Sequence, residues 1–358
     1  MKVTGFDNKM SNFNDLSERT IRERINQSQN WEAWIDAEDT RRHSYLGSMN
    51  WETRNGKAYL YRRTGKIGKS LGPRSPETEA AIAAFNEGKQ RIEQRLARLG
   101  DQLNTQAAIL RGLRHTRLSE TAAKVLREMR IHGRNHGARV VGTNALYAYE
   151  ALAGVLFEEG MTATGDIDIL LDDRNRMRLI ADTKEALGIT RLIQEKVDKT
   201  FRPHGPNGYR LTNDSGYMVE FIRPLPRPFS RQMPGAAPLE PDDVTAVPLD
   251  GLQWLVNAPE VDTIVIDARG FPAPLSCPDP RHFAAHKLWV AALSDRDAGK
   301  ALRDRTQASA VIDLIVQKLP QFPLDDAFMA TLPSAIGGLL ADALKSRPTT
   351  GPKGAPDW

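Results

Sequence analysis

The sequence has almost no cysteine and no long hydrophobic run, and both absences exclude classes of protein. Cys277 is the only cysteine among 358 residues, so the chain can form no intrachain disulfide and no four-cysteine zinc site. No apolar stretch is long enough to cross a bilayer, and the N-terminal segment lacks the apolar core of a signal peptide. We therefore expect a cytoplasmic protein without a membrane partner.

Several enzyme motifs are missing as well. The chain has no G-x-x-x-x-G-K-[ST] phosphate-binding loop and no kinase catalytic loop. Ser70, Ser215 and Ser276 stand in no nucleophile-elbow pattern. If the chain is an enzyme, its chemistry must come from other residues.

Acidic residues are absent from one stretch of the chain. Arg54 to Arg74 contains seven lysines and arginines and no Asp or Glu, and its turn signals predict a small basic β-meander. A cationic surface with tyrosines can follow a nucleic-acid backbone and stack on bases, although ordinary hairpin packing with solubilising charges explains it equally well. The candidate nucleic-acid-binding residues are Arg54, Lys57, Tyr59, Tyr61, Arg62, Arg63, Lys66 and Lys69.

Length and periodicity predict five segments with an α/β (α+β) fold overall. Residues 1–74 hold the basic β-meander, and residues 75–135 form a helical arm that starts at Ser75 and Pro76, with a break at Gly100. Residues 136–275 alternate strands and helices around a small mixed sheet, residues 276–346 form a helical C-terminal domain, and residues 347–358 form a disordered tail.

Two aspartates lie in a predicted buried strand, within the sequence VVGTNALYAYEALAGVLFEEGMTATGDIDILL. Asp166 and Asp168 project to the same side of that strand, while Ile167 and Ile169 point into the core. Neighbouring carboxylates raise each other's pKa, and Mg²⁺, which prefers carboxylate and phosphate oxygens, removes the repulsion. The alternative is a pair of solvent-facing residues at the end of a strand.

Two other features accompany the aspartates. Glu220, in YMVEFIRP, has apolar neighbours on both sides and is expected to complete a metal cluster, unless it lies on an edge strand. The Gly142-Thr143 turn stands between a strand and a helix, 24 residues before Asp166. Backbone N–H groups and a hydroxyl at such a turn can hold phosphates.

These motifs resemble the DNA polymerase β-like nucleotidyltransferase superfamily. Its layout is G-[ST] after a strand, then a helix, h-D-h-D-h, and h-E-h on a neighbouring strand. The sequences YLYRRTGKIGKSLGPRSPETEA and RHFAAHKLWVAALSDRDAGKALRDRTQASAVIDL resemble a bacterial branch of that superfamily, so the resemblance runs from the meander to residue 318. It implies that residues 136–275 are a nucleotidyltransferase core with Asp166, Asp168 and Glu220 as catalytic residues and metal ligands.

The resemblance also implies a reaction and further site residues. Two Mg²⁺ or Mn²⁺ ions would support transfer of an NMP from an NTP, such as ATP, to an acceptor hydroxyl on an RNA 3′ end, a tRNA or a protein, with release of pyrophosphate. Lys287 matches a helical lysine that contacts the triphosphate, or is a surface lysine. Lys300, Arg303 and Asp304 match a basic-acidic motif, although Arg303 and Asp304 can also be read as a surface ion pair. With Gly142 and Thr143, these four are the candidate nucleotide-binding residues.

Two other functions fit the same sequence. A non-catalytic nucleic-acid-binding protein on a degenerate transferase fold would bind RNA or DNA without turning over NTP. A toxin-like enzyme neutralised by an antitoxin protein would share the chemistry but arrest growth.

Overall fold

The computed structural model describes residues 12–65, 67–133, 135, 137–172, 188–204, 208–225 and 246–347. The chain divides into two compact units. The hairpin unit comprises Glu18–Glu120 and Ile266–Pro272, and the core unit comprises Met1–Ser17, Thr121–Val265 and Ala273–Trp358. The five-segment division expected from the sequence stays a prediction, whereas the predicted mixture of helices and sheets is confirmed.

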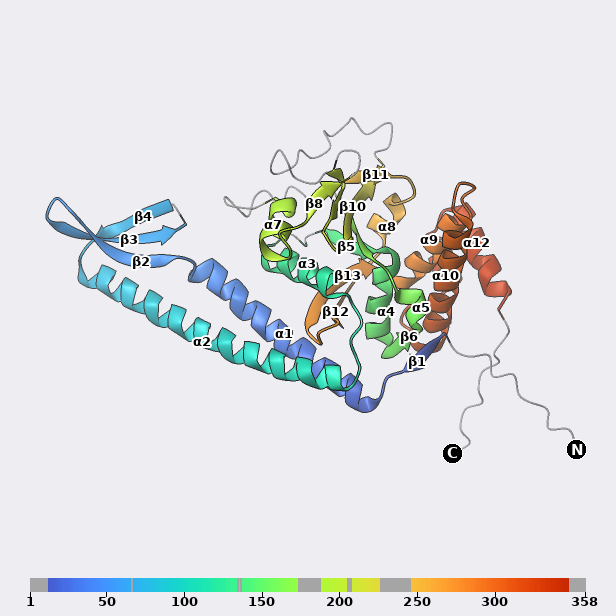
Figure 1. Ribbon diagram of the computed structural model, residues 1–358, viewed down its shortest axis with the longest axis horizontal. Coiled ribbons are helices and arrows are strands. Elements are labelled where there is room, and N and C mark those ends of the chain that lie inside the picture. The colour runs from blue at the N-terminus through green and yellow to red at the C-terminus, as the bar shows by residue number, and fades with distance from the viewer. Residues whose placement is uncertain are drawn as a thin grey trace, which may run out of the picture. The chain divides into compact units, whose positions relative to one another are not determined.

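The hairpin unit is a pair of long helices joined by a three-stranded meander (Figure 1). Helix α1 (Glu18–Ser44) leads into β2 (Ser48–Arg54), β3 (Lys57–Thr64) and β4 (Ile67–Pro73), and α2 (Pro76–Gly112) follows. The predicted meander is confirmed. Arg54 pairs with Lys57 across a turn at Asn55 and Gly56, which both have positive φ. Lys66 lies outside the described residues.

Helix α2 starts where the sequence predicts and continues further than expected. Ser75 accepts a hydrogen bond from the Thr78 N–H in a capping box, with a proline in the first turn. The break predicted at Gly100 is wrong, because α2 runs through to Gly112. Leu99 and Leu103, on either side of it, are buried, and such packing outweighs the roughly 1 kcal/mol by which glycine disfavours a helix.

The core unit is built on a six-stranded mixed sheet with the order β5-β7-β10-β9-β8, in which β11 also pairs with β10. Strand β10 is parallel to β7 and β11, and the other neighbours are antiparallel. The side chains of Ile167, Ile169, Val219 and Phe221 are fully buried in the core. The strands are β5 (Ala138–Val141), β7 (Asp166–Leu171), β8 (Arg202–His204), β9 (Arg210–Thr212), β10 (Met218–Pro224) and β11 (Val247–Leu249).

Helices and two short strand pairs complete the core unit. The strand pairs are β1 (Phe13–Asp15) with β6 (Val155–Phe157), and β12 (Glu260–Ile266) with β13 (Pro272–Pro278), whose connection belongs to the hairpin unit. The helices that precede or follow the central strands are α3 (Glu120–Ile131), the short 3-10 helix η1 (Gly142–Ala145), α4 (Leu146–Ala153), α5 (Glu159–Thr162), α7 (Ile189–Lys196) and α8 (Gln253–Asn257).

The C-terminal part is helical, as predicted. Helix α9 (Pro280–Ala291) packs against α10 (Ala298–Lys318) and α12 (Ser334–Lys345) (Figure 1). The short helix α11 (Asp326–Met329) precedes α12. The predicted tail lies outside the described residues except for Arg347, which forms an ion pair with Asp313. Among the helices described, none has the length and apolar character needed to span a bilayer.

Candidate active site

A row of side chains crosses four strands of the central sheet. Asp168 on β7 lies opposite Glu220 on the parallel strand β10 and opposite Val141 on β5. Arg210 on β9 lies opposite Glu220 on its other side. Because residues in register on neighbouring strands project to the same face, the predicted carboxylates and one arginine are neighbours on that face. Asp166 is two residues before Asp168 and shares its side of β7.

Asp168 lies in an environment that disfavours its charge. Burial, followed by the charges of Asp166 and Glu220, raises its pKa from 3.8 to about 7, while Lys287 and Arg210 act in the opposite direction. The two acidic neighbours are thus close enough to repel it. A cation bound at these oxygens would relieve the repulsion.

The Gly142-Thr143 turn sits directly against Asp168. Gly142 has φ +64°, and a Cβ atom there would lie 2.3 Å from Asp168 Oδ2. Only glycine therefore allows both this backbone conformation and this carboxylate position. Asn144 Nδ2 donates to the Asp166 carbonyl oxygen at 2.7 Å, and the Thr164 hydroxyl donates to Asp166 Oδ1. The Asn144 bond ties η1 to the first residue of β7.

Glu220 is engaged by an arginine that the sequence reasoning missed. Arg210 Nη2 lies 2.7 Å from Glu220 Oε1 and donates to the Tyr209 hydroxyl, also at 2.7 Å. Within the described ranges, no group of three His, Cys, Asp or Glu residues has an arrangement that could hold a metal ion. The three carboxylates are neighbours, but Glu220 is neutralised by Arg210, and their role as metal ligands stays a prediction.

Lys287 belongs to a buried ion cluster between α9 and α10. Its Nζ donates to Asp304 Oδ1 at 2.7 Å, and Arg296 Nη2 donates to Asp304 Oδ2 at 2.6 Å. Lys287 and Asp304 are both buried, so the surface-lysine alternative is wrong. Burial lowers the pKa of Lys287, while Asp304 and Asp168 counteract that effect. Lys287 therefore lies within electrostatic reach of Asp168.

The other two residues of the basic-acidic motif have different surroundings. Arg303 donates to the Ala163 carbonyl oxygen, and Asp304 pairs with Lys287 and Arg296, so the alternative of an Arg303–Asp304 surface pair is wrong. Adjacent residues of a helix do not face each other, which explains the difference. Lys300 is exposed in the first turn of α10, where its main-chain N–H donates to Asp297. No described contact joins its side chain to the carboxylates.

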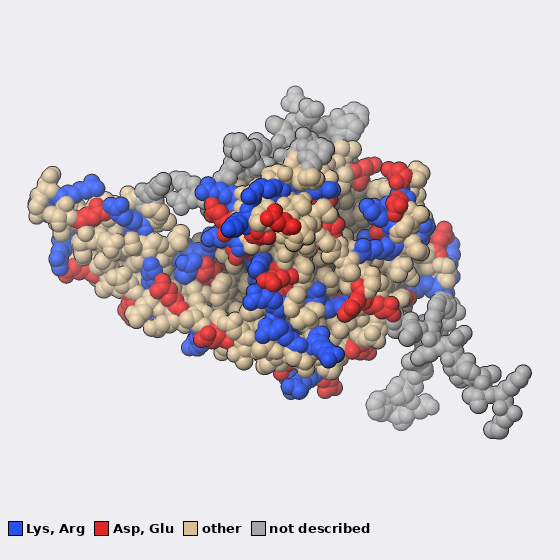
Figure 2. Space-filling model, viewed as in Figure 1, with Lys and Arg blue, Asp and Glu red and all other residues tan. Residues whose placement is uncertain are grey.

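Several cations of the meander have partners inside the hairpin unit. Arg63 pairs with Glu52 at 2.5 Å, Arg54 lies 4.8 Å from the Tyr61 ring centre, and Arg62 donates to the Ser44 carbonyl oxygen at 2.8 Å. Figure 2 shows basic and acidic side chains interspersed over this part of the surface. Among the candidate nucleic-acid-binding cations, Lys57 and Lys69 are exposed and take part in none of these three contacts. Nucleic-acid binding by Tyr59, Tyr61 and these cations stays a prediction.

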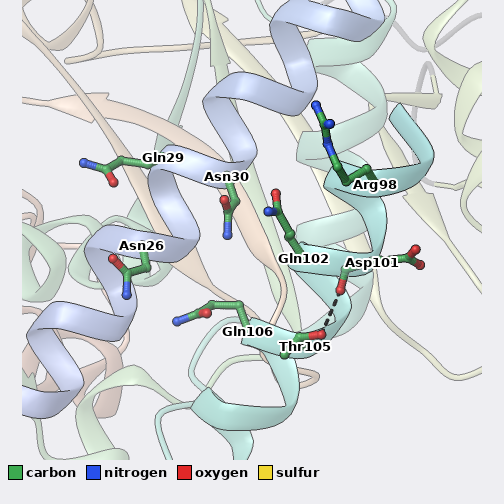
Figure 3. Close-up of a pocket in the computed structure, with 8 residues that line it drawn as sticks. All are labelled: Asn26, Gln29, Asn30, Arg98, Asp101, Gln102, Thr105 and Gln106. Carbon is green, nitrogen blue, oxygen red and sulfur yellow. Dashed lines mark hydrogen bonds between the residues drawn. The ribbon is translucent and has the colours of Figure 1, made fainter. Parts of the chain in front are cut away.

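A separate hollow of about 470 Å³ lies in the hairpin unit, between α1 and α2 (Figure 3). It contains none of the predicted catalytic or nucleotide-binding residues. Five of its eight lining side chains are amides: Asn26, Gln29, Asn30, Gln102 and Gln106. The other three are Arg98, Asp101 and Thr105. Most of the eight are exposed, whereas Gln106 is buried. This hollow is not the candidate active site.

Comparison with known families identifies the class of protein. A model of a nucleotidyltransferase family matches residues 120–333, which is more than half of the chain. The chain belongs to this nucleotidyltransferase family. The match includes the Gly142 turn, the three carboxylates and the buried lysine cluster, and it leaves out the basic meander.

Individual proteins add little to that assignment. No curated protein matches the chain. One solved structure is similar, that of an antigenic nucleotidyltransferase-like protein from Paracoccidioides brasiliensis. It is 16% identical, covers 64% of this chain and 91% of its own, and has a TM-score of 0.33. A likeness at that level supports no conclusion about function.

Proposed function

We propose that the core unit is a metal-dependent nucleotidyltransferase of the DNA polymerase β-like type, from a bacterial branch of that superfamily. It would transfer an NMP from an NTP to an acceptor hydroxyl and release pyrophosphate. The observation that carries this proposal is the parallel pairing of β7 and β10, which sets Glu220 beside Asp168 next to the Gly142 turn. Membership of the nucleotidyltransferase family supports nucleotidyl transfer as the reaction.

The residues present fit a divalent cation by their chemistry. Asp166, Asp168 and Glu220 offer hard carboxylate oxygens, the ligands that Mg²⁺ and Mn²⁺ prefer. The pKa of Asp168 is raised first by burial and then by the charges of Asp166 and Glu220, and bound cations would offset the repulsion among these carboxylates. Two bound ions would make the acceptor hydroxyl more acidic and stabilise charge on the leaving pyrophosphate. For Glu220 to take part, its ion pair with Arg210 must open.

The chain's own residues would hold the triphosphate. The main-chain N–H groups at Gly142 and Thr143 and the Thr143 hydroxyl are donors beside Asp168. Lys287 supplies a positive charge on the same side, and Asp304 keeps that charge in place through the 2.7 Å bond. In this proposal Asp304 is a positioning residue, and Arg303 and Lys300 are further cations on α10 that would attract the nucleotide.

We propose RNA, including a tRNA 3′ end, as the first acceptor to test, with a protein hydroxyl as the second. The support for RNA is the cationic meander with its tyrosines, where Lys57 and Lys69 are exposed. The toxin-like variant of the same reaction, with an antitoxin partner, would be recognised by growth arrest on expression that an Asp168→Ala substitution abolishes.

A labelling experiment tests the reaction. The protein is incubated with each radiolabelled NTP, with Mg²⁺ or Mn²⁺, and with total cellular RNA or protein. We expect label transfer to one acceptor that disappears in Asp166→Ala and Asp168→Ala and persists in Glu195→Gln, which changes an exposed carboxylate paired with Arg191 on α7.

The opposite result has a defined meaning. Absence of transfer to any acceptor, together with absence of a nucleotide-dependent thermal shift, would contradict the proposal. Salt-sensitive RNA or DNA binding in the same preparation would then favour the non-catalytic nucleic-acid-binding protein.

A further inference from the structure

A fully buried glutamine connects α10 to the Gly142-Thr143 turn. Gln307 has no exposed surface. Its Nε2 donates to the main-chain carbonyl oxygen of Met161, on α5, at 2.8 Å. The same nitrogen donates to Thr143 Oγ1 at 3.3 Å. All three residues belong to the core unit.

The Met161 carbonyl fixes which way round the Gln307 amide lies. A carbonyl oxygen can only accept, so the amide must present its NH₂ group to it. In the flipped orientation, Gln307 Oε1 would face the Met161 oxygen, and two acceptors would repel each other. The amide orientation is therefore determined by the main chain and not by Thr143.

That orientation assigns a role to the Thr143 hydroxyl. Because Gln307 Nε2 is a donor, Thr143 Oγ1 accepts from it, and the hydroxyl proton stays available for another acceptor. Gln307 Oε1, meanwhile, is buried without a hydrogen-bond partner among the residues described. A buried orphan acceptor is unfavourable, which indicates that this arrangement serves more than stability.

We infer that Gln307 is a positioning residue that holds the Thr143 hydroxyl as a hydrogen-bond donor toward an anionic phosphate of the bound nucleotide. The inference rests on the proposed function, in which the Gly142-Thr143 turn holds the triphosphate. Gln307 does not itself touch the nucleotide. It acts through the Thr143 oxygen, in the same way that Asp304 acts through Lys287.

A double-mutant cycle tests this role. The affinities of ATP, GTP, CTP and UTP, each with Mg²⁺, are measured by calorimetry for the wild type, Gln307→Met, Thr143→Val and the double variant. We expect Gln307→Met and Thr143→Val each to weaken binding of the preferred NTP by about 3- to 10-fold, the range of one neutral hydrogen bond. The double variant should be no weaker than Thr143→Val alone.

A matched control separates positioning from loss of packing. Gln194→Met makes the same change on α7, where Gln194 Nε2 donates to the Phe201 carbonyl oxygen at 2.8 Å. We expect this variant to bind nucleotide like the wild type. Gln307→Glu gives a second test, because its acceptor oxygens would capture the Thr143 proton, and its binding should be weaker than that of Gln307→Met.

Several outcomes would overturn the inference. Unchanged nucleotide affinity in Gln307→Met would show that Gln307 does not act through the hydroxyl. The same conclusion would follow if Gln307→Met lowered the affinity equally in the wild-type and Thr143→Val backgrounds. If the wild type binds none of the four nucleotides, the proposed function fails, and this inference fails with it. If the wild type binds a nucleotide and Gln307→Met binds it with the same affinity, the inference about Gln307 is overturned but the proposed function is not.

Discussion

The close approach of Gly142 to Asp168 makes Gly142→Ala an informative perturbation. The added Cβ would lie 2.3 Å from Asp168 Oδ2, about 1 Å inside the normal contact distance, so the carboxylate must move. The positive φ of +64° adds roughly 1–2 kcal/mol of backbone strain for any residue with a Cβ. A displacement of about 1 Å in a reacting group can lower activity about 100-fold.

Gly216 provides the matched control, because it has φ +79° and a Cβ added there would meet nothing within 4 Å. Gly216→Ala therefore imposes the same kind of strain without moving a carboxylate. We expect urea denaturation to show a loss of about 1–2 kcal/mol in both variants. The label-transfer rate should fall about 100-fold in Gly142→Ala only.

Two results would refute this reasoning. Activity near the wild-type level in Gly142→Ala would show that the position of Asp168 next to the turn is not needed. An equal loss of activity in Gly216→Ala would show that stability, and not the carboxylate, accounts for the effect.

Three further predictions concern charge. Burial raises the folded-state pKa of Asp168 to about 7 from 3.8, so wild-type stability falls as pH rises through that interval. In EDTA, Asp168→Asn should therefore have a higher Tm than the wild type at pH 8 and nearly the same Tm at pH 4, and a lower Tm at pH 8 would contradict this. Asp304→Asn leaves two cations without their buried carboxylate and should lower the free energy of unfolding by about 3 kcal/mol in urea, whereas a change under about 1 kcal/mol would argue against a tight cluster. If the meander binds RNA, Lys57→Ala with Lys69→Ala should make the slope of log affinity against log salt shallower by about 1.4, and Lys345→Ala on α12 should leave it unchanged. Equal slopes in all three proteins would exclude these two lysines as phosphate contacts.

The local pattern of the sequence was sufficient to predict the two core strands that carry the three acids. Asp166 and Asp168 alternate with buried isoleucines, and Glu220 stands between apolar neighbours. This alternation of polar and apolar residues is typical of a strand, and it predicted a strand position for each carboxylate. The structure adds that β7 and β10 are adjacent and in register.

Features that depend on pairing or packing were missed. Arg210 could have been found if residues 209–212 and 217–223 had been paired as a hairpin, because that register sets it beside Glu220. Gln307 had no local signal, since a glutamine within a long helix is buried only because of what α10 packs against. The error at Gly100 has the same origin, because helix propensity was outweighed by the burial of its neighbours.

The ion pair between Arg210 and Glu220 bears directly on the central claim that three carboxylates share a cation site. The claim is tested by a crystal structure with Mn²⁺ and a non-hydrolysable NTP, in which anomalous scattering locates the metal. We predict Mn²⁺ bound by oxygens of Asp166, Asp168 and Glu220, with the 2.7 Å contact between Arg210 and Glu220 opened. Mn²⁺ bound elsewhere, or Glu220 still paired with Arg210 beside a bound nucleotide, would contradict it.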